Sequence, residues 1–120
     1  MGSGTVLIVE DEPSAREALA EILEFEGFGV ATAAHGAEAW KYLQDSAPPC
    51  LIVLDLMMPV MDGRQFRALQ LQDPWLAKIP VVVVSALGAS SVADLHPTAV
   101  VRKPVNVDTL LEVIEANCRN

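Results

Sequence analysis

Short apolar runs alternate with longer amphipathic segments along this chain. The runs lack polar alternation, which is typical of strands that are covered on both faces of a parallel sheet. They span residues 6–9, 29–32, 51–54, 81–84 and 99–101. Each run is followed by a segment in which apolar residues recur with a helical period. The pattern therefore predicts five strand–helix units.

The first amphipathic segment shows the helical period most clearly. Ala15, Leu19 and Ile22 fall on one stripe of a helix. Pro13 suits the first turn of this helix, and Gly27 suits its end. Further helices are predicted over residues 37–44, 64–72 and 107–118. Residues 88–95 carry only a weak pattern, so we expect a short or degenerate fourth helix there.

Repeated strand–helix units restrict the topology, because right-handed crossovers place helices on both faces of a parallel sheet. We expect an α/β fold with a flavodoxin-like doubly wound sheet of five strands, in the order 2-1-3-4-5. In such sheets, ligands bind beyond the carboxyl ends of the strands, where the winding reverses. The first and third strands are neighbours at that point.

Composition adds constraints on the class of protein. The chain has 120 residues, a hydrophobic content of 52% and a net charge of −8, which together predict one domain with a sizeable core and argue against a nucleic-acid surface. No apolar run reaches the length of a membrane span. Cys50 and Cys118 have neither CxxC nor metal-type spacing. We expect two free thiols, a cytoplasmic location and an expression scar at residues 1–4 before a domain over residues 5–118.

Polar residues stand where the predicted strands end. Glu10 and Asp11 follow the first strand, Asp55 the third, Ser85 the fourth and Lys103 the fifth. Clustered carboxylates repel one another unless a cation offsets their charge, and Mg²⁺ prefers such oxygen ligands. A metal, an ammonium group and a hydroxyl around one carboxylate are the groups expected for phosphoryl transfer. The carboxylate itself can be the nucleophile.

Each of these residues also has an ordinary structural explanation when taken singly. An acid after a strand commonly caps the next helix, and a strand-end serine or a surface lysine needs no function. Asp55 is harder to explain in this way, because it directly follows the apolar run at residues 51–54, which is typical of a buried strand, and an isolated buried carboxylate is costly to keep charged. The joint placement at one sheet edge therefore favours a functional site.

Four motifs carry a resemblance to a known family. They are VLIVEDE at residues 6–12, DLMMPVMDG at residues 55–63, VSA at residues 84–86 and KP at residues 103–104. The set resembles the receiver domains of two-component response regulators, a family that includes single-domain chemotaxis regulators. The resemblance extends from Thr5 to Cys118.

The resemblance implies a role for each matching position. Asp55 would be the phosphoacceptor, and Ser85 and Lys103 would bind phosphoryl oxygens. Mg²⁺ or Mn²⁺ would be held by Glu10, Asp11, Asp55 and the main-chain carbonyl of Met57. The phosphoryl group would come from a histidine kinase or a histidine phosphotransfer protein, and an output partner that the sequence does not name would read the result. The resemblance implies a signalling domain, not an enzyme, that assists its own phosphorylation and dephosphorylation. Family members often have a cis peptide bond at the position of Lys103–Pro104.

The sequence departs from the family pattern at two places, and two further positions bear on the lifetime of the phosphoryl group. Val100 stands where an aromatic switch residue is usual, and the segment from Ser85 to Lys103 is a few residues shorter than usual. Met57 and Leu87 occupy the positions that tune hydrolysis, and neither side chain can orient a water. We expect intact phosphorylation chemistry, an atypical output face and slow self-dephosphorylation.

Three other classes of protein were weighed against this interpretation. A haloacid-dehalogenase-type phosphatase needs an acid two residues after its nucleophile, where this chain has Met57. A flavin-binding module needs a phosphate loop rich in Ser, Thr and Gly, where this chain has an acidic segment over residues 10–13. A degenerate receiver that acts as a phosphorylation-independent scaffold is the strongest rival, although its usual mark, loss of Asp55 or Lys103, is absent.

Overall fold

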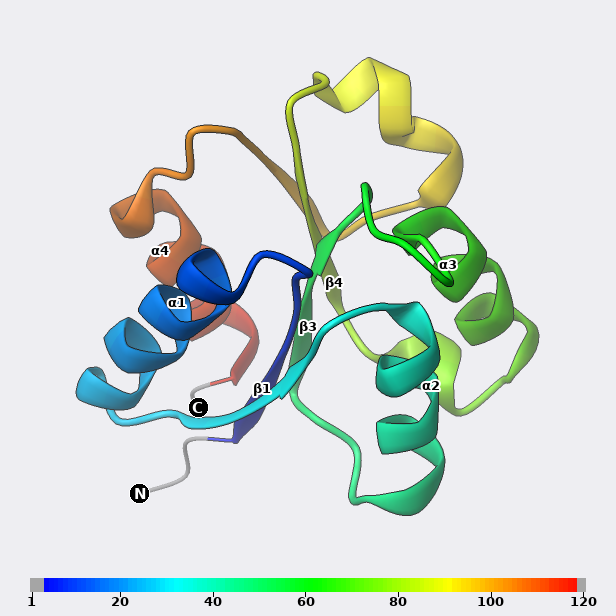
Figure 1. Cartoon of the computed structure of the whole chain (residues 1–120), viewed down its shortest axis with the longest axis horizontal. Coiled ribbons are helices and arrows are strands. Elements are labelled where there is room, and N and C mark those ends of the chain that lie inside the picture. Colours follow the sequence, from blue (N-terminus) through cyan, green and yellow to red (C-terminus); the bar gives the residue numbers. More distant parts are fainter. Residues whose placement is uncertain (1–3, 119–120) are drawn as a thin grey trace.

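Five parallel strands form one sheet in the order β2-β1-β3-β4-β5, which confirms the predicted topology (Figure 1). The computed structural model describes residues 4–118. The strands are β1 (Thr5–Val9), β2 (Gly29–Ala33), β3 (Leu51–Asp55), β4 (Val81–Ser85) and β5 (Ala99–Arg102). Because β1 pairs with both β2 and β3, the winding reverses beside β1. The carboxyl ends of β1 and β3 are therefore neighbours.

Helices cover both faces of the sheet (Figure 1). One face carries α1 (Pro13–Phe25) and α4 (Val107–Cys118), and the other carries α2 (Gly36–Asp45) and α3 (Gly63–Gln72). The segment between β4 and β5 is a 3₁₀ helix, η2 (Ala89–Leu95), which confirms the expected short fourth helix. A further 3₁₀ turn, η1 (Leu76–Lys78), was not predicted.

The core lies in two layers, one on each side of the sheet. Successive strand residues alternate between them: Leu7, Ile52 and Leu54 pack under α2, α3 and η2. Ile8 and Val53 pack under α1 and α4. Since both faces are covered, every residue of β3 and β4 is buried. This explains why the strand sequences are continuously apolar.

The two cysteines correct the prediction of free thiols. Cys50 directly precedes β3 and Cys118 ends α4, and the structure joins them in a disulfide across a sequence separation of 68 residues. Their Cα atoms are 5.4 Å apart, which is within bonding range. The prediction was wrong because the fold, rather than sequence spacing, brings the end of α4 to the start of β3. With the cysteines paired, the expected cytoplasmic location has no support from free thiols.

Two further predictions concern the chain ends and the membrane. The scar was predicted over residues 1–4, of which residues 1–3 lie outside the described residues. No helix within residues 4–118 combines the length and apolar character that crossing a membrane requires.

Candidate functional site

The carboxylates predicted to converge do so at the switch point of the sheet. Glu10 and Asp11 follow β1, and Asp55 ends β3. One carboxylate oxygen from each lies within 4.8 Å of the other two. Glu10 and Asp55 are buried, whereas Asp11 is exposed and opens the cluster to solvent. The arrangement gathers three negative charges at one point.

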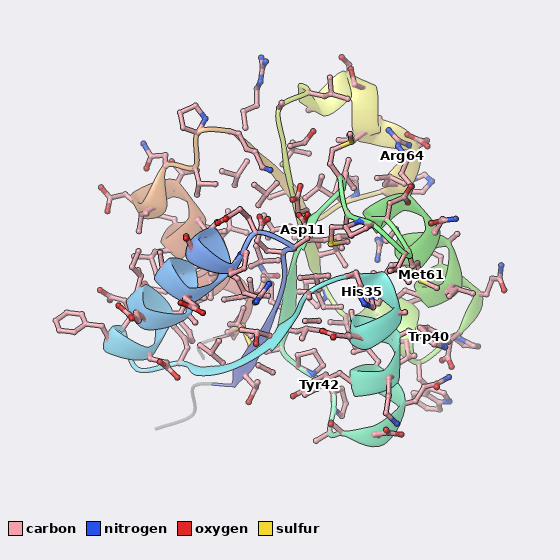
Figure 2. The ribbon with its side chains drawn as sticks, viewed as in Figure 1. Asp11, His35, Trp40, Tyr42, Met61 and Arg64 are labelled. Carbon is pink, nitrogen blue, oxygen red and sulfur yellow. A yellow bond between two sulfur atoms is a disulfide. The ribbon has the colours of Figure 1, made fainter. Side chains whose placement is uncertain are left out.

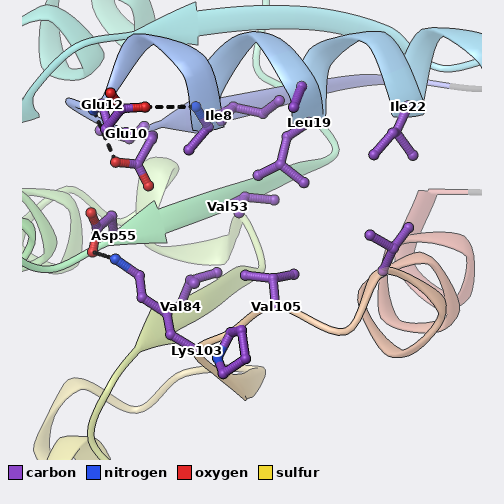
Figure 3. Close-up of a pocket in the computed structure, with 15 residues that line it drawn as sticks. Ile8, Glu10, Glu12, Leu19, Ile22, Val53, Asp55, Val84, Lys103 and Val105 are labelled. Carbon is purple, nitrogen blue, oxygen red and sulfur yellow. Dashed lines mark hydrogen bonds and ion pairs between the residues drawn. The ribbon is translucent and has the colours of Figure 1, made fainter.

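Lys103 supplies the positive charge nearest to this cluster. Its Nζ lies 3.2 Å from Oδ1 of Asp55, whose residue is only 4% exposed (Figure 3). The same Oδ1 accepts a long hydrogen bond of 3.4 Å from the main-chain N–H of Met57. A buried carboxylate needs such partners to stay charged. Asp55 thus has an ammonium group and a main-chain donor on one oxygen.

Ser85 lies at the end of β4 and is buried. Its carbonyl accepts a hydrogen bond from the main-chain N–H of Lys103, so the ends of β4 and β5 are tied together. Its hydroxyl accepts from the N–H of Leu87 at 2.9 Å, which leaves the hydroxyl proton available to another acceptor. The Lys103–Pro104 bond is cis, as the resemblance implied.

Glu10 is fixed by three hydrogen bonds. Its N–H donates to the carbonyl of Ala33, its carbonyl accepts from Nη1 of Arg16 at 2.8 Å, and its carboxylate accepts from the N–H of Glu12. The side chain of Glu12 caps α1 by accepting from the N–H of Ala15. The third acid of this strand end therefore has a structural role. Sequence reasoning missed the role of Arg16 in holding the main chain of Glu10. A single basic residue one helical turn after three acids could have indicated this contact.

Burial raises the pKa of the Glu10 carboxyl above its usual value, and the hydrogen bond from Glu12 opposes this shift. Repulsion from Asp55 and, more weakly, Asp11 raises the same pKa, while Lys103 lowers it. A cation bound among these oxygens would relieve the repulsion.

The loop after β3 is tightly folded against the site. A Cβ on Gly63 would lie 2.5 Å from the main-chain oxygen of Asp55, so only glycine fits at the start of α3. The N–H of Gly63 also donates to the carbonyl of Leu56. Within the loop, Val60 has φ 67° and its side chain is 78% exposed. The loop thus combines close backbone packing with one left-handed residue.

An apolar cavity of about 430 Å³ lies beneath the acids, between α1 and α4 (Figure 3). Val53 and Val84 line it on the sheet side, and Leu19 lines it from α1. Glu10 and Lys103 stand at its polar end. Apart from the acids and Lys103, the side chains that line this cavity are apolar and offer the cluster no hydrogen-bond donor.

The remaining predicted positions lie around the site. Met57 is 81% exposed and lines a surface hollow together with Asp11, whereas Leu87 is about half exposed and reaches the site through its N–H bond to the Ser85 hydroxyl. Val100 is partly buried on β5 and packs on the α2–α3 side of the sheet. Val100 and the two positions expected to tune hydrolysis therefore lie on different parts of the molecule, with Val100 on the α2–α3 side of the sheet.

Comparisons with known proteins identify the family. The model of the response regulator receiver domain matches residues 6–115, and the chain belongs to this family. The response regulator Rre1 of Synechocystis sp. is 42% identical over 85 residues, which are 70% of this chain and 36% of Rre1. This chain therefore spans about a third of that relative.

Solved structures agree with this assignment. The signal receiver domain of a signal transduction histidine kinase from Syntrophus aciditrophicus superposes with a TM-score of 0.89 at 29% identity, covering 97% of this chain and 90% of that one. The Mn²⁺-bound form of response regulator Rcp1 gives a TM-score of 0.76 at 29% identity, covering 94% and 90%. The chain is thus a receiver domain of two-component signalling, a class that histidine kinases phosphorylate and that binds Mg²⁺ at an acidic pocket.

Proposed function

We propose that this receiver domain accepts a phosphoryl group on Asp55 from the phosphohistidine of a histidine kinase or a histidine phosphotransfer protein. The observation that carries the proposal is the buried Asp55 carboxylate, with two further carboxylates within 4.8 Å and the Lys103 ammonium at 3.2 Å. An aspartate with a purely structural role would be stabilised by Lys103 alone, and two further carboxylates beside it would only destabilise the fold.

The donor set fits a hard divalent cation. Glu10, Asp11 and Asp55 offer oxygen ligands, and the main-chain carbonyl of Met57 would add a fourth. Mg²⁺, or Mn²⁺ as in the related Rcp1 structure, would neutralise charge on the transferring phosphoryl group. The exposure of Asp11 leaves room for water ligands, which Mg²⁺ usually keeps.

In the transfer, a carboxylate oxygen of Asp55 forms a bond to phosphorus while the bond from phosphorus to the donor imidazole nitrogen breaks. The electron pair of the broken bond stays on that nitrogen. Lys103 then pairs with a phosphoryl oxygen, and the Ser85 hydroxyl donates its free proton to another. The buried main chain of β3 keeps Asp55 in place throughout.

The lifetime of the phosphoryl group would depend on the residues beside it. Hydrolysis requires a water aligned with the bond from phosphorus to Asp55. Met57 stands two residues after Asp55 and Leu87 two residues after Ser85, and their apolar side chains cannot orient that water by hydrogen bonding. We therefore propose slow self-dephosphorylation, in a domain that acts as a signal carrier rather than as an enzyme with turnover.

Intact-mass analysis after incubation with acetyl phosphate and Mg²⁺ tests the proposal. We expect the mass of one phosphoryl group to be gained by the native chain and by Asp45→Asn, a matched change at an exposed acid on α2. Asp55→Asn should gain nothing. No gain by the native chain would favour the phosphorylation-independent scaffold instead.

A further inference from the structure

A stripe of polar side chains runs along α3, facing η2 over most of its length and η1 at its end. Arg64, Arg67 and Gln70 follow one another at three-residue spacing, so they lie on one side of the helix. We call these three residues the α3 seam. Arg67 and Gln70 are buried, although such residues are usually exposed. Their burial needs an explanation that phosphoryl transfer does not provide.

Arg67 is the centre of the seam and is only 4% exposed. Its Nε donates to the carbonyl of Leu95 at 2.9 Å, and its Nη2 donates to the carbonyl of His96 at 2.9 Å. No carboxylate within the described residues forms an ion pair with it. Burial lowers the pKa of this guanidinium from its usual value, yet arginine stays charged. A buried charge is therefore balanced by main-chain carbonyl dipoles at the end of η2.

Gln70 extends the seam toward β4. Its Oε1 accepts from Nη1 of Arg67 at 2.7 Å, and its Nε2 donates to the carbonyls of Leu76 and Ile79. No buried side-chain polar atom within residues 4–118 lacks a hydrogen-bond partner. A fully satisfied buried network of this kind rigidifies the elements that it joins.

Arg64 continues the seam at the other end of α3, on the side of the helix next to η2 (Figure 2). It pairs with Asp94 at 2.9 Å and donates to the carbonyl of Ser91 at 3.0 Å. Both contacts are exposed, so each is weaker than those of Arg67. The two arginines together hold η2 from its middle to the residue that ends it.

The form of η2 explains why it needs these donors. A 3₁₀ helix leaves carbonyls without partners at its end, and His96, which caps η2 directly after Leu95, has a left-handed conformation with φ 50°. Arg67 binds the carbonyls of Leu95 and His96 at this end. The bonds are to main chain, so they fix the path of η2 rather than one of its side chains.

We propose that the α3 seam makes residues 91–98 one rigid unit with α3, so that the response to phosphorylation is confined to residues 86–90. This inference rests on the proposed function of Asp55. Ser85 can move toward a phosphoryl group only by displacing the segment after it, which contains Gly88 in open surroundings. Val100 has no ring to carry the movement into β5. Arg102, at the end of β5, contacts the carbonyl of Ala86 only through an exposed side chain, and the seam blocks the path through η2.

Amide hydrogen exchange of the whole unphosphorylated chain tests the seam itself. We expect the amides of His96 and Thr98, which donate to Ala93 and Val81, to exchange at least tenfold faster in Arg67→Met. Arg67→Lys keeps the charge but cannot reach both carbonyls, so it should give an intermediate rate. Lys41→Met, at an exposed ion pair on α2, is the control. The proposal would be overturned if the amides of His96 and Thr98 exchanged at the native rate in Arg67→Met, or at the native rate in Arg67→Lys.

Amide chemical shifts with beryllofluoride and Mg²⁺ test the consequence. Shifts at Met57 and Lys103 would report that the phosphoryl mimic binds. We then expect further shifts at residues 86–90 but not at residues 92–98 of the native chain, and a spread into residues 92–98 in Arg67→Lys. Native shifts at residues 92–98 as large as those at 86–90 would contradict the inference. Without any shift, the function proposed for Asp55 fails, while hydrogen exchange still decides whether the seam is rigid.

Discussion

Val60 stores backbone strain in the loop that follows β3, and its replacement by glycine should stabilise the protein. Its φ of 67° lies in the left-handed region, which is a genuine outlier for a β-branched residue. This conformation costs about 1–2 kcal/mol for a residue with a Cβ. The side chain is 78% exposed, so its removal gives up little buried apolar area.

The expected gain follows from two opposing contributions. Val60→Gly relieves the strain but increases the entropy of the unfolded chain, which costs about 0.5–1 kcal/mol. The net stabilisation should be about 0.5–1 kcal/mol, which would move the urea midpoint upward by about 0.5 M at an unchanged slope. Val60→Asn should give a smaller gain, because asparagine tolerates the left-handed region better than valine does.

Equilibrium urea unfolding measures this effect, and Val113→Gly is the matched control. The same chemical change within α4 meets helical backbone and a partly buried side chain, so it should destabilise the chain by at least about 1 kcal/mol. A midpoint of Val60→Gly at or below that of the native chain would show that Val60 is not strained, and the reasoning would be refuted.

Three further predictions concern the acids, the lifetime and the disulfide. Folding raises the pKa of Glu10, so the folded state favours the protonated carboxyl. The stability that this carboxyl contributes is present at acidic pH and is lost as the pH rises through the folded-state pKa. Glu10→Gln should therefore raise the melting temperature of the metal-free protein at neutral pH but not below about pH 4, and an equal effect at both would contradict this. Met57→Asn should shorten the phosphoryl lifetime about five- to tenfold, since one hydrogen bond to the attacking water is worth about 1 kcal/mol; an unchanged decay of the phosphorylated mass would refute it. Reduction of the Cys50–Cys118 disulfide should lower the free energy of unfolding by about 4 kcal/mol in the chain-entropy account, because the closed loop is long, and urea curves with and without reductant check this.

The sheet and the placement of the acids were predictable because they depend on local pattern and on general topology. Strand residues buried on both faces read as continuous apolar runs, and right-handed crossovers then fix the strand order. Once the order is known, Glu10 and Asp55 must meet at the switch point. The short fourth helix was also visible, because residues 88–95 lack a strong helical period.

The features that the sequence did not reveal depend on tertiary contacts. Periodicity assigns arginine and glutamine to the solvent face, so burial of Arg67 and Gln70 was not foreseen; it depends on carbonyls that η1 and η2 present from elsewhere. The disulfide was missed for the same reason. The left-handed conformation of Val60 contradicts the local preference of valine, so the sequence could not predict it.

The most direct test of the central claim is to locate the phosphoryl group after transfer from a phosphohistidine donor. Borohydride reduction of the phosphorylated chain converts an aspartyl phosphate to homoserine, which peptide mass spectrometry assigns to one position. We predict homoserine at residue 55 alone, formed only when Mg²⁺ is present during the transfer. Homoserine at Asp11 or elsewhere with Asp55 unmodified, or none after prolonged incubation with the donor, would contradict the assignment of Asp55 as the phosphoacceptor.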